Sequence, residues 1–202
     1  MDPLCSWCWG FAPSMQAVVE RFGAALPMEI VVGGLRAGNT VPMDATLRNY
    51  VQGHWEKVYE ASGQRFNFAF KMPEGFIYDT EPPCRALKVA QEIEPKHVLT
   101  LSHAIQKAFY VDNRDVTQEA VLAKVAQEAG LDGAVFAAAL GEERFRAAAQ
   151  ADFRRAREEL NVCSFPTLLG ENARGVSVVS PGFCPPELLI RRVQTWLDPY
   201  AS

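Results

Sequence analysis

The sequence predicts a small α/β domain interrupted by a long helical insertion. Strand patterns occur only near the two ends of the 202 residues, and the region between them shows helical patterns almost throughout. The predicted organisation is an α/β part in residues 1–41, an all-helical insertion in residues 42–160, and the rest of the α/β part in residues 161–202. Hydrophobic residues make up 49% of the chain, which is enough to bury a core.

A helix followed by a buried strand is predicted in the first part. Apolar residues recur at intervals of three and four over residues 5–23, where Pro13 should kink the helix and Gly23 should end it. An apolar run then predicts a buried strand over residues 28–35, which ends at the glycine pair 33–34.

Capping residues mark the successive helices of the insertion. Asp44 is suited to cap the first helix, Asp79 or Thr80 the second, and Thr117 a later one. Pro95 should break the second helix. The predicted helices cover about residues 44–61, 80–94, 96–111, 117–130, 133–140 and 142–160, and the aromatic stretch 64–78 is predicted to be irregular.

Two strands and a helix are predicted in the last part. The strands cover residues 165–169 and 176–180, and the glycine-bounded segment 170–175 suits a hairpin turn between them. The dipeptide Pro185-Pro186 then opens a final amphipathic helix.

The bulk composition excludes several classes of partner. The net charge is −4 and there is no basic stripe interleaved with aromatic residues, so we expect no nucleic-acid partner. No apolar stretch approaches the roughly 20 residues needed to span a bilayer, so we expect no membrane association. The first residues lack the basic and apolar regions of a signal peptide, which predicts a cytoplasmic protein.

Cys5 and Cys8 carry the chemistry that the sequence predicts. There are five cysteines, too few for a disulfide-stapled scaffold, and the C-x-x-C spacing is typical of a redox pair or of half a zinc site. Zinc needs four ligands and the three histidines are scattered, so we favour a redox pair and no metal. The start of a helix stabilises a thiolate, which makes Cys5 the expected nucleophile and Cys8 the resolving thiol.

The chain resembles the DsbA-like family over essentially its whole length. The resemblance rests on Cys-Ser-Trp-Cys at residues 5–8, at the head of a helix, and on Phe-Pro-Thr at residues 165–167, opening a late strand. Residues 2–10, 78–86 and 108–110 resemble the FrnE-type branch of predicted disulfide isomerases. The resemblance implies a thioredoxin fold with an inserted helical domain, and a protein disulfide oxidoreductase or isomerase.

The resemblance also implies roles for residues around the cysteine pair. Pro166 is expected to be a cis proline facing Cys5 and Cys8, and the backbone of Phe165 is expected to pair with an extended substrate peptide. Trp7, inside the motif, is expected at the surface against substrate. No metal and no organic cofactor are implied. The expected partners are protein thiols and disulfides, or glutathione as a co-substrate.

The N-terminus departs from the family pattern. Members of the family have a central strand immediately before the C-x-x-C helix, whereas four residues precede Cys5 here. Without that strand its two neighbours would have unpaired backbone groups. We therefore expect that the natural protein is longer at its N-terminus, or that strand exchange completes the fold.

The three additional cysteines are candidate accessory thiols. Cys84 is expected to be a small buried residue, with a reactive thiol as the alternative. Cys163 and Cys184 are expected to pack at helix starts. The alternative is a second dithiol at the active-site end of the sheet, which requires Cα atoms within about 7 Å.

Two further functions are weighed against disulfide exchange. The first is a glutathione-dependent transferase or isomerase of small molecules on the same fold, against which the intact pair of Cys5 and Cys8 argues. The second is a redox-inactive chaperone or metal-binding module. The direction of exchange and the oligomeric state stay open at this level, because C-x-x-C pairs serve oxidases, reductases and isomerases alike.

Overall fold

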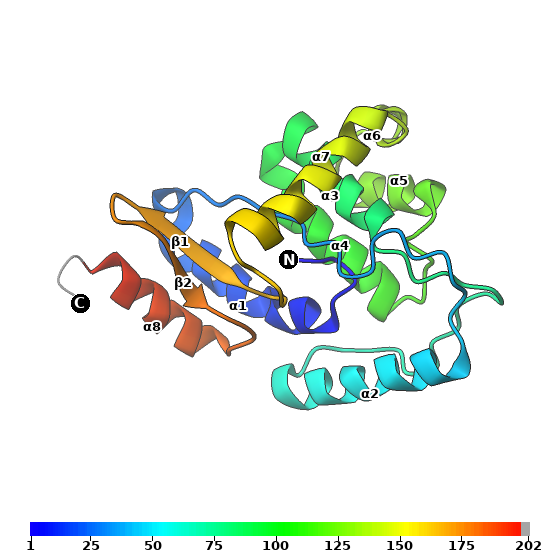
Figure 1. Cartoon of the computed structure of the whole chain (residues 1–202), viewed down its shortest axis with the longest axis horizontal. Coiled ribbons are helices and arrows are strands. Elements are labelled where there is room, and N and C mark those ends of the chain that lie inside the picture. Colours follow the sequence, from blue (N-terminus) through cyan, green and yellow to red (C-terminus); the bar gives the residue numbers. More distant parts are fainter. Residues whose placement is uncertain (199–202) are drawn as a thin grey trace.

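The computed structural model describes residues 1–198. Figure 1 shows helices α3 to α7 gathered on one side of α1, and the hairpin β1–β2 with α8 on the other. The elements are α1 (Ser6–Phe22), η1 (Gly23–Ala25), α2 (Ala45–Ser62), α3 (Glu81–Ile93), η2 (Pro95–His97), α4 (Val98–Tyr110), α5 (Glu119–Glu128), α6 (Gly133–Leu140), α7 (Glu143–Arg154), the π-helical turn η3 (Arg155–Glu159), β1 (Leu168–Asn172), β2 (Gly175–Ser180) and α8 (Pro186–Leu197).

Helix α1 lies between two hydrophobic cores. Trp9 belongs to the large core, which is built mainly from the helical part of the chain. Phe11 and Val18 belong to a smaller core with Leu189 and Val193 of α8. The helix that begins with the C-x-x-C motif is therefore anchored on both sides, which limits how far Cys8 can move.

Pro13 lies inside α1 without ending it. Proline has no N–H, so the carbonyl of Trp9, four residues earlier, loses its helical donor. The side-chain amide of Gln64 donates to that carbonyl at 3.0 Å. The missing helical bond is thus replaced from outside, and the helix runs on to Phe22 and ends at Gly23 as predicted.

The predicted strand over residues 28–35 is wrong. Its backbone groups bond mainly to side chains rather than to a neighbouring strand: the Val32 N–H donates to Asp152 at 3.1 Å, and Gln91 donates to the Ile30 carbonyl at 2.7 Å. Among residues 1–198, strand-like pairing is confined to Met1, whose amino group donates to the Val31 carbonyl at 2.7 Å and whose carbonyl accepts the Gly33 N–H at 2.8 Å. The segment is therefore extended and partly buried but does not form a ladder.

The sheet of the described residues has two antiparallel strands, β1 and β2. Strand β1 begins at Leu168 instead of residue 165, and it continues through Gly170, so the predicted turn over residues 170–175 is too long. A Cβ at Gly170 would lie 2.3 Å from the indole of Trp196. Gly170 is thus a strand position that lets α8 pack closely, not a turn residue.

The predicted helices of the insertion occur, with one cap misplaced. The Asp44 carboxylate accepts the Leu47 N–H at 2.7 Å, which confirms it as the cap of α2. Helix α5, however, begins at Glu119, because the Thr117 hydroxyl donates to Asp115 at 2.6 Å and does not cap the helix.

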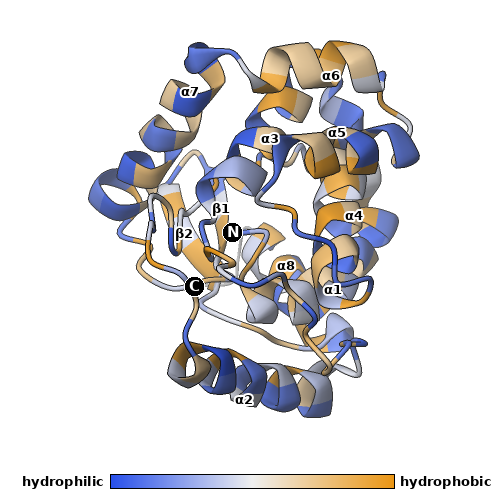
Figure 2. Ribbon diagram, turned by 90° about the vertical axis from the view of Figure 1, so that its right-hand side faces the viewer, coloured by the Kyte–Doolittle hydropathy of each residue, from blue (hydrophilic) through white to orange (hydrophobic). Residues whose placement is uncertain are grey.

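The end of the insertion combines a hydrophobic helix with a polar one. Helix α6 has the predicted bounds, Gly133 to Leu140, and is hydrophobic along almost all its length (Figure 2). Its Phe136 and Leu140 are fully buried, whereas Val135 is 53% exposed. The predicted helix 142–160 is α7 followed by the π-helical turn η3.

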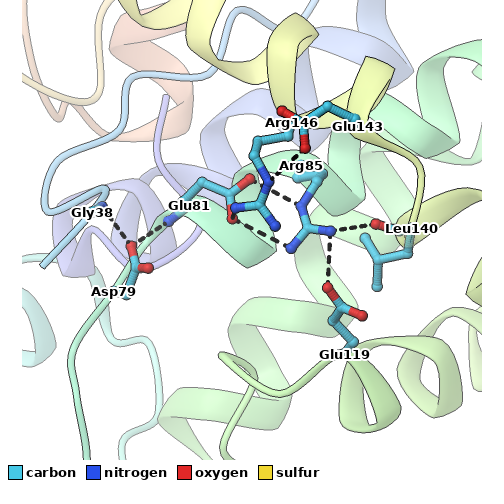
Figure 3. A network of polar contacts seen from close by, with 8 residues as sticks. All are labelled: Gly38, Asp79, Glu81, Arg85, Glu119, Leu140, Glu143 and Arg146. Carbon is cyan, nitrogen blue, oxygen red and sulfur yellow. Dashed lines mark hydrogen bonds and ion pairs between the residues drawn. The ribbon is translucent and has the colours of Figure 1, made fainter. Parts of the chain in front are cut away.

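An ionic network centred on the buried Arg85 ties the helices of the insertion together (Figure 3). The guanidinium of Arg85, on α3, pairs with Glu81 at 2.9 Å and with Glu119 of α5 at 2.9 Å, and it also donates to the Leu140 carbonyl at the end of α6. Arg146 of α7 reaches Glu81 at 3.3 Å. One buried arginine thus supplies donors to three helices, which makes it a structural centre of this part.

Candidate active site

Cys5 is the N-cap residue of α1, and Cys8 lies in its first turn. Both are nearly buried, with 7% and 5% of their surface exposed. The backbone N–H groups of Trp7 and Cys8 face the Cys5 sulfur. Unpaired N–H groups at a helix start stabilise a negative charge, so this position favours a thiolate on Cys5.

The pKa values of the two thiols are shifted in opposite directions. The Cys8 side chain hydrogen-bonds the Cys5 sulfur and lowers the pKa of Cys5, although burial and the negative charge of Asp2 oppose this effect. Burial is the main cause that raises the pKa of Cys8, and the neighbouring Cys5 sulfur raises it further. The geometry therefore suits Cys5 as the nucleophile and Cys8 as a protonated neighbour.

A segment 160 residues further along the chain lies against Cys5. The Cys5 thiol donates to the carbonyl of Phe165 at 3.4 Å. The peptide bond between Phe165 and Pro166 is cis. Pro166 is buried and Phe165 is half-buried. Four of the residues singled out in the sequence, Cys5, Cys8, Phe165 and Pro166, thus form one site.

Gly33 is a site residue that the sequence reading missed. A Cβ at this position would lie 2.0 Å from Cζ of the Phe165 ring, so the ring packs directly on the Gly33 backbone. The glycine pair at residues 33–34 was the available signal, but it predicts only the end of a strand. In the structure, Gly33 makes room for the aromatic ring of Phe165, whose carbonyl contacts Cys5.

Replacing Gly33 with alanine is expected to displace the Phe165 ring and its carbonyl from Cys5. Overpacking of this kind costs about 1–3 kcal/mol of unfolding free energy. Losing an acceptor that holds the proton on the Cys5 thiol should also raise the rate at which Cys5 is alkylated. Urea denaturation and the alkylation rate of Cys5 measure the two effects. Gly53→Ala is the control: nothing lies within 4 Å of its added methyl, so this helical variant should gain about 0.5–1 kcal/mol. A Gly33→Ala protein that matches the wild type in both assays would contradict this role.

Trp7 has an aromatic neighbour that the sequence did not indicate. Its ring centroid lies 5.7 Å from that of Phe183, in the loop between β2 and α8. Both rings are half-buried, so Trp7 is less exposed than expected. The pair forms an apolar flank next to the cysteine motif.

The other cysteines differ in their surroundings. Cys84 is fully buried, its thiol donates to the Asp2 carboxylate at 3.6 Å, and burial raises its pKa. Such a thiol lacks the access that a reactive accessory thiol needs. Cys184 is buried in the smaller core, whereas Cys163 is exposed. Both are free thiols, and the second dithiol stays a prediction.

Residues 1–198 contain neither a cluster of metal ligands nor a membrane-spanning helix. No group of three or more His, Cys, Asp or Glu side chains in this part of the chain is placed to hold a metal ion. None of its helices is both long and apolar enough to cross a membrane.

Among the solved structures that resemble this chain are proteins named as disulfide isomerases or reductases. A candidate protein disulfide isomerase from Nitrosomonas europaea is 36% identical, with a TM-score of 0.89 over 97% of this chain and 94% of that one. The cytosolic disulfide reductase DsbM from Pseudomonas aeruginosa is 28% identical, with a TM-score of 0.79 over 97% of this chain and 95% of its own. DsbM has also been solved with glutathione.

A relative with lower sequence identity is named as an adapter protein and not as an enzyme of disulfide exchange. The ClpXP adapter protein SpxH of Halalkalibacterium halodurans is 26% identical over 180 residues, which cover 84% of this chain. The matched region spans 56% of the length of that relative.

The family follows from these similarities and from the fold. The thioredoxin family model matches residues 1–178. The mostly helical chain with its small sheet is consistent with a thioredoxin fold that carries a helical insertion. The chain therefore belongs to the thioredoxin family and, within it, to the DsbA-like thiol–disulfide oxidoreductases.

Proposed function

We propose that Cys5 and Cys8 are the redox pair with which this protein exchanges disulfides in protein substrates or in glutathione. The observation that carries the proposal is the placement of the Cys5 sulfur at the start of α1, 3.4 Å from the Phe165 carbonyl and next to Cys8. A thiol of lowered pKa, a second thiol beside it and the half-buried Phe165 backbone are thus close together, which supports disulfide exchange at this point.

The reaction proceeds in two exchanges. The Cys5 thiolate attacks one sulfur of a substrate disulfide, forms a mixed disulfide and releases the other sulfur as a thiolate. Cys8 then attacks the Cys5 sulfur, forms the Cys5–Cys8 disulfide and releases the second substrate thiolate, and the proton of Cys8 passes to a released thiolate. One disulfide has been reduced to two thiols, and two equivalents of a small thiol such as glutathione restore the dithiol. Oxidation of substrate thiols is the same sequence reversed.

The substrate is proposed to lie along the Phe165 backbone. An extended peptide beside this residue can form main-chain hydrogen bonds, as in the addition of a strand to a sheet edge. The half-buried pair of Trp7 and Phe183 would then contact apolar side chains of the same substrate. The similarity to the cytosolic reductase DsbM, also solved with glutathione, supports glutathione as a partner and a cytoplasmic location.

The equilibrium reduction potential of the pair tests the proposal. Titration against reduced and oxidised glutathione is expected to show one two-electron transition, which Cys5→Ser should abolish. A Cys163→Ser protein is the matched control and should keep the transition, since the proposed redox pair does not include this exposed thiol. If no transition appears, the redox function is wrong. Glutathione conjugation that survives Cys8→Ser would favour the transferase instead.

A further inference from the structure

Asp2 is a buried acidic residue whose backbone contacts both cysteines of the pair. It is 0% exposed and lies three residues before Cys5. Its main-chain carbonyl accepts the Cys5 N–H at 3.1 Å, and its own N–H faces the Cys8 sulfur. Asp2 therefore contacts the backbone or side chain of both cysteines.

The Asp2 carboxylate also joins this loop to two other segments. One oxygen accepts the Leu4 N–H at 2.8 Å, and the other accepts the Leu35 N–H at 2.6 Å and the Cys84 thiol at 3.6 Å. The Thr80 hydroxyl adds a further hydrogen bond. Thr80 and Cys84 belong to the beginning of α3. The carboxylate thus accepts hydrogen bonds from three parts of the chain: the residues just before Cys5, the segment after Gly33 and the helical insertion.

A side chain that served only as a hydrogen-bond acceptor could be uncharged at this position. Burying a carboxylate is costly unless its hydrogen bonds compensate, and burial does raise the pKa of Asp2 despite its donors. The same negative charge opposes ionisation of Cys5. Other titratable groups that interact with Asp2 are the Met1 amino group, Tyr78, Cys84 and Tyr110.

We propose that Asp2 is a positioning residue, held by Cys84 and Thr80 of α3, whose buried charge lowers the reduction potential of the Cys5–Cys8 pair and directs the protein toward reducing substrate disulfides. This inference rests on the proposed redox function. A negative charge near the Cys5 thiolate destabilises the dithiol form relative to the disulfide, in which neither sulfur is charged. The dithiol then gives up its electrons more readily.

Asp2→Asn tests this role by removing the charge at nearly constant shape. The equilibrium constant for reduction of the Cys5–Cys8 disulfide by glutathione is expected to rise about tenfold, which corresponds to roughly 30 mV for a two-electron couple. The pH at which Cys5 becomes reactive toward iodoacetamide should fall in the same variant. Cys84→Ala, which removes one donor to the carboxylate, should shift both quantities in the same direction by less.

Asp79→Asn is the matched control. Asp79 also lies at the start of α3, and its carboxylate accepts the Gly38 and Glu81 N–H groups, each at 2.9 Å. Its loss should leave the potential of the cysteine pair unchanged. Equal potentials in wild type and Asp2→Asn, or an equal shift in Asp79→Asn, would overturn the inference while the two-electron transition itself persists. Absence of that transition in the wild type would instead overturn the proposed function.

A measurement on the wild type keeps the inference testable if Asp2→Asn does not fold. Coupling is reciprocal, so a carboxylate that disfavours the Cys5 thiolate must itself be harder to ionise when the thiolate is present. Carbon NMR of the Asp2 carboxyl should therefore show, in the dithiol form, a change that follows the ionisation of Cys5 and is missing in the disulfide form. Identical titrations in the two forms would overturn the inference.

Discussion

Cys8→Ser is expected to stop the catalytic cycle after its first exchange and to leave substrate attached to Cys5. Serine cannot attack the mixed disulfide, while Cys5 keeps its place at the start of α1 and its contact with Phe165. At low glutathione, turnover should fall to the background rate. Intact-mass spectrometry after treatment with oxidised glutathione should show one glutathionyl group per chain.

The exposed thiol of Cys163 must be removed to interpret this experiment. In a Cys163→Ser background, the adduct of Cys8→Ser should persist in full, and the additional change Cys5→Ser should abolish it. An adduct that forms without Cys5, or full turnover without Cys8, would contradict the assignment of nucleophile and resolving thiol.

Arg85→Ala is expected to have the largest effect on stability. The arginine is 3% exposed, and its removal would leave Glu81 without its main partner in a buried position. Breaking a buried ion pair on one side costs about 3–5 kcal/mol, and the remaining contact of Glu81 with Arg146 should keep the loss near the lower limit. Urea denaturation followed by circular dichroism measures the unfolding free energy.

Arg144→Ala provides the control for the loss of an arginine. Arg144 also pairs with two glutamates, Glu92 and Glu142, but its side chain is 53% exposed. Ion pairs in water contribute little to stability, so this variant should unfold close to the wild type. If both variants unfold at the same urea concentration, the Arg85 network does not hold the helices together.

Local patterns predicted most of the helices. Helix α6 occurs at the predicted bounds, and α1 ends at Gly23, because turn and capping residues act on their immediate neighbours. Even the cap of α2 by Asp44 depends only on a residue three positions away. The cap at Thr117 failed because another local partner, Asp115, takes its hydroxyl.

The extended segments were harder to predict, because pairing depends on distant parts of the chain. Residues 28–35 carry a strand pattern, yet their backbone groups bond to side chains from α3 and α7. Gly170 suits a turn but lies in β1, where Trp196 of α8 needs the space. In both cases the local preference is overridden by side chains that the local pattern does not contain.

The sequence by itself determined where the proposed redox pair lies and which thiol is favoured as its nucleophile, because the spacing of Cys5 and Cys8 and their place at a helix start are local properties. Only the tertiary structure decided what surrounds the pair. It brings the Phe165 carbonyl to Cys5 across 160 positions and the Cys84 thiol to Asp2 across 82. Such contacts depend on how α1 packs against the rest of the chain, and no short-range pattern encodes that packing.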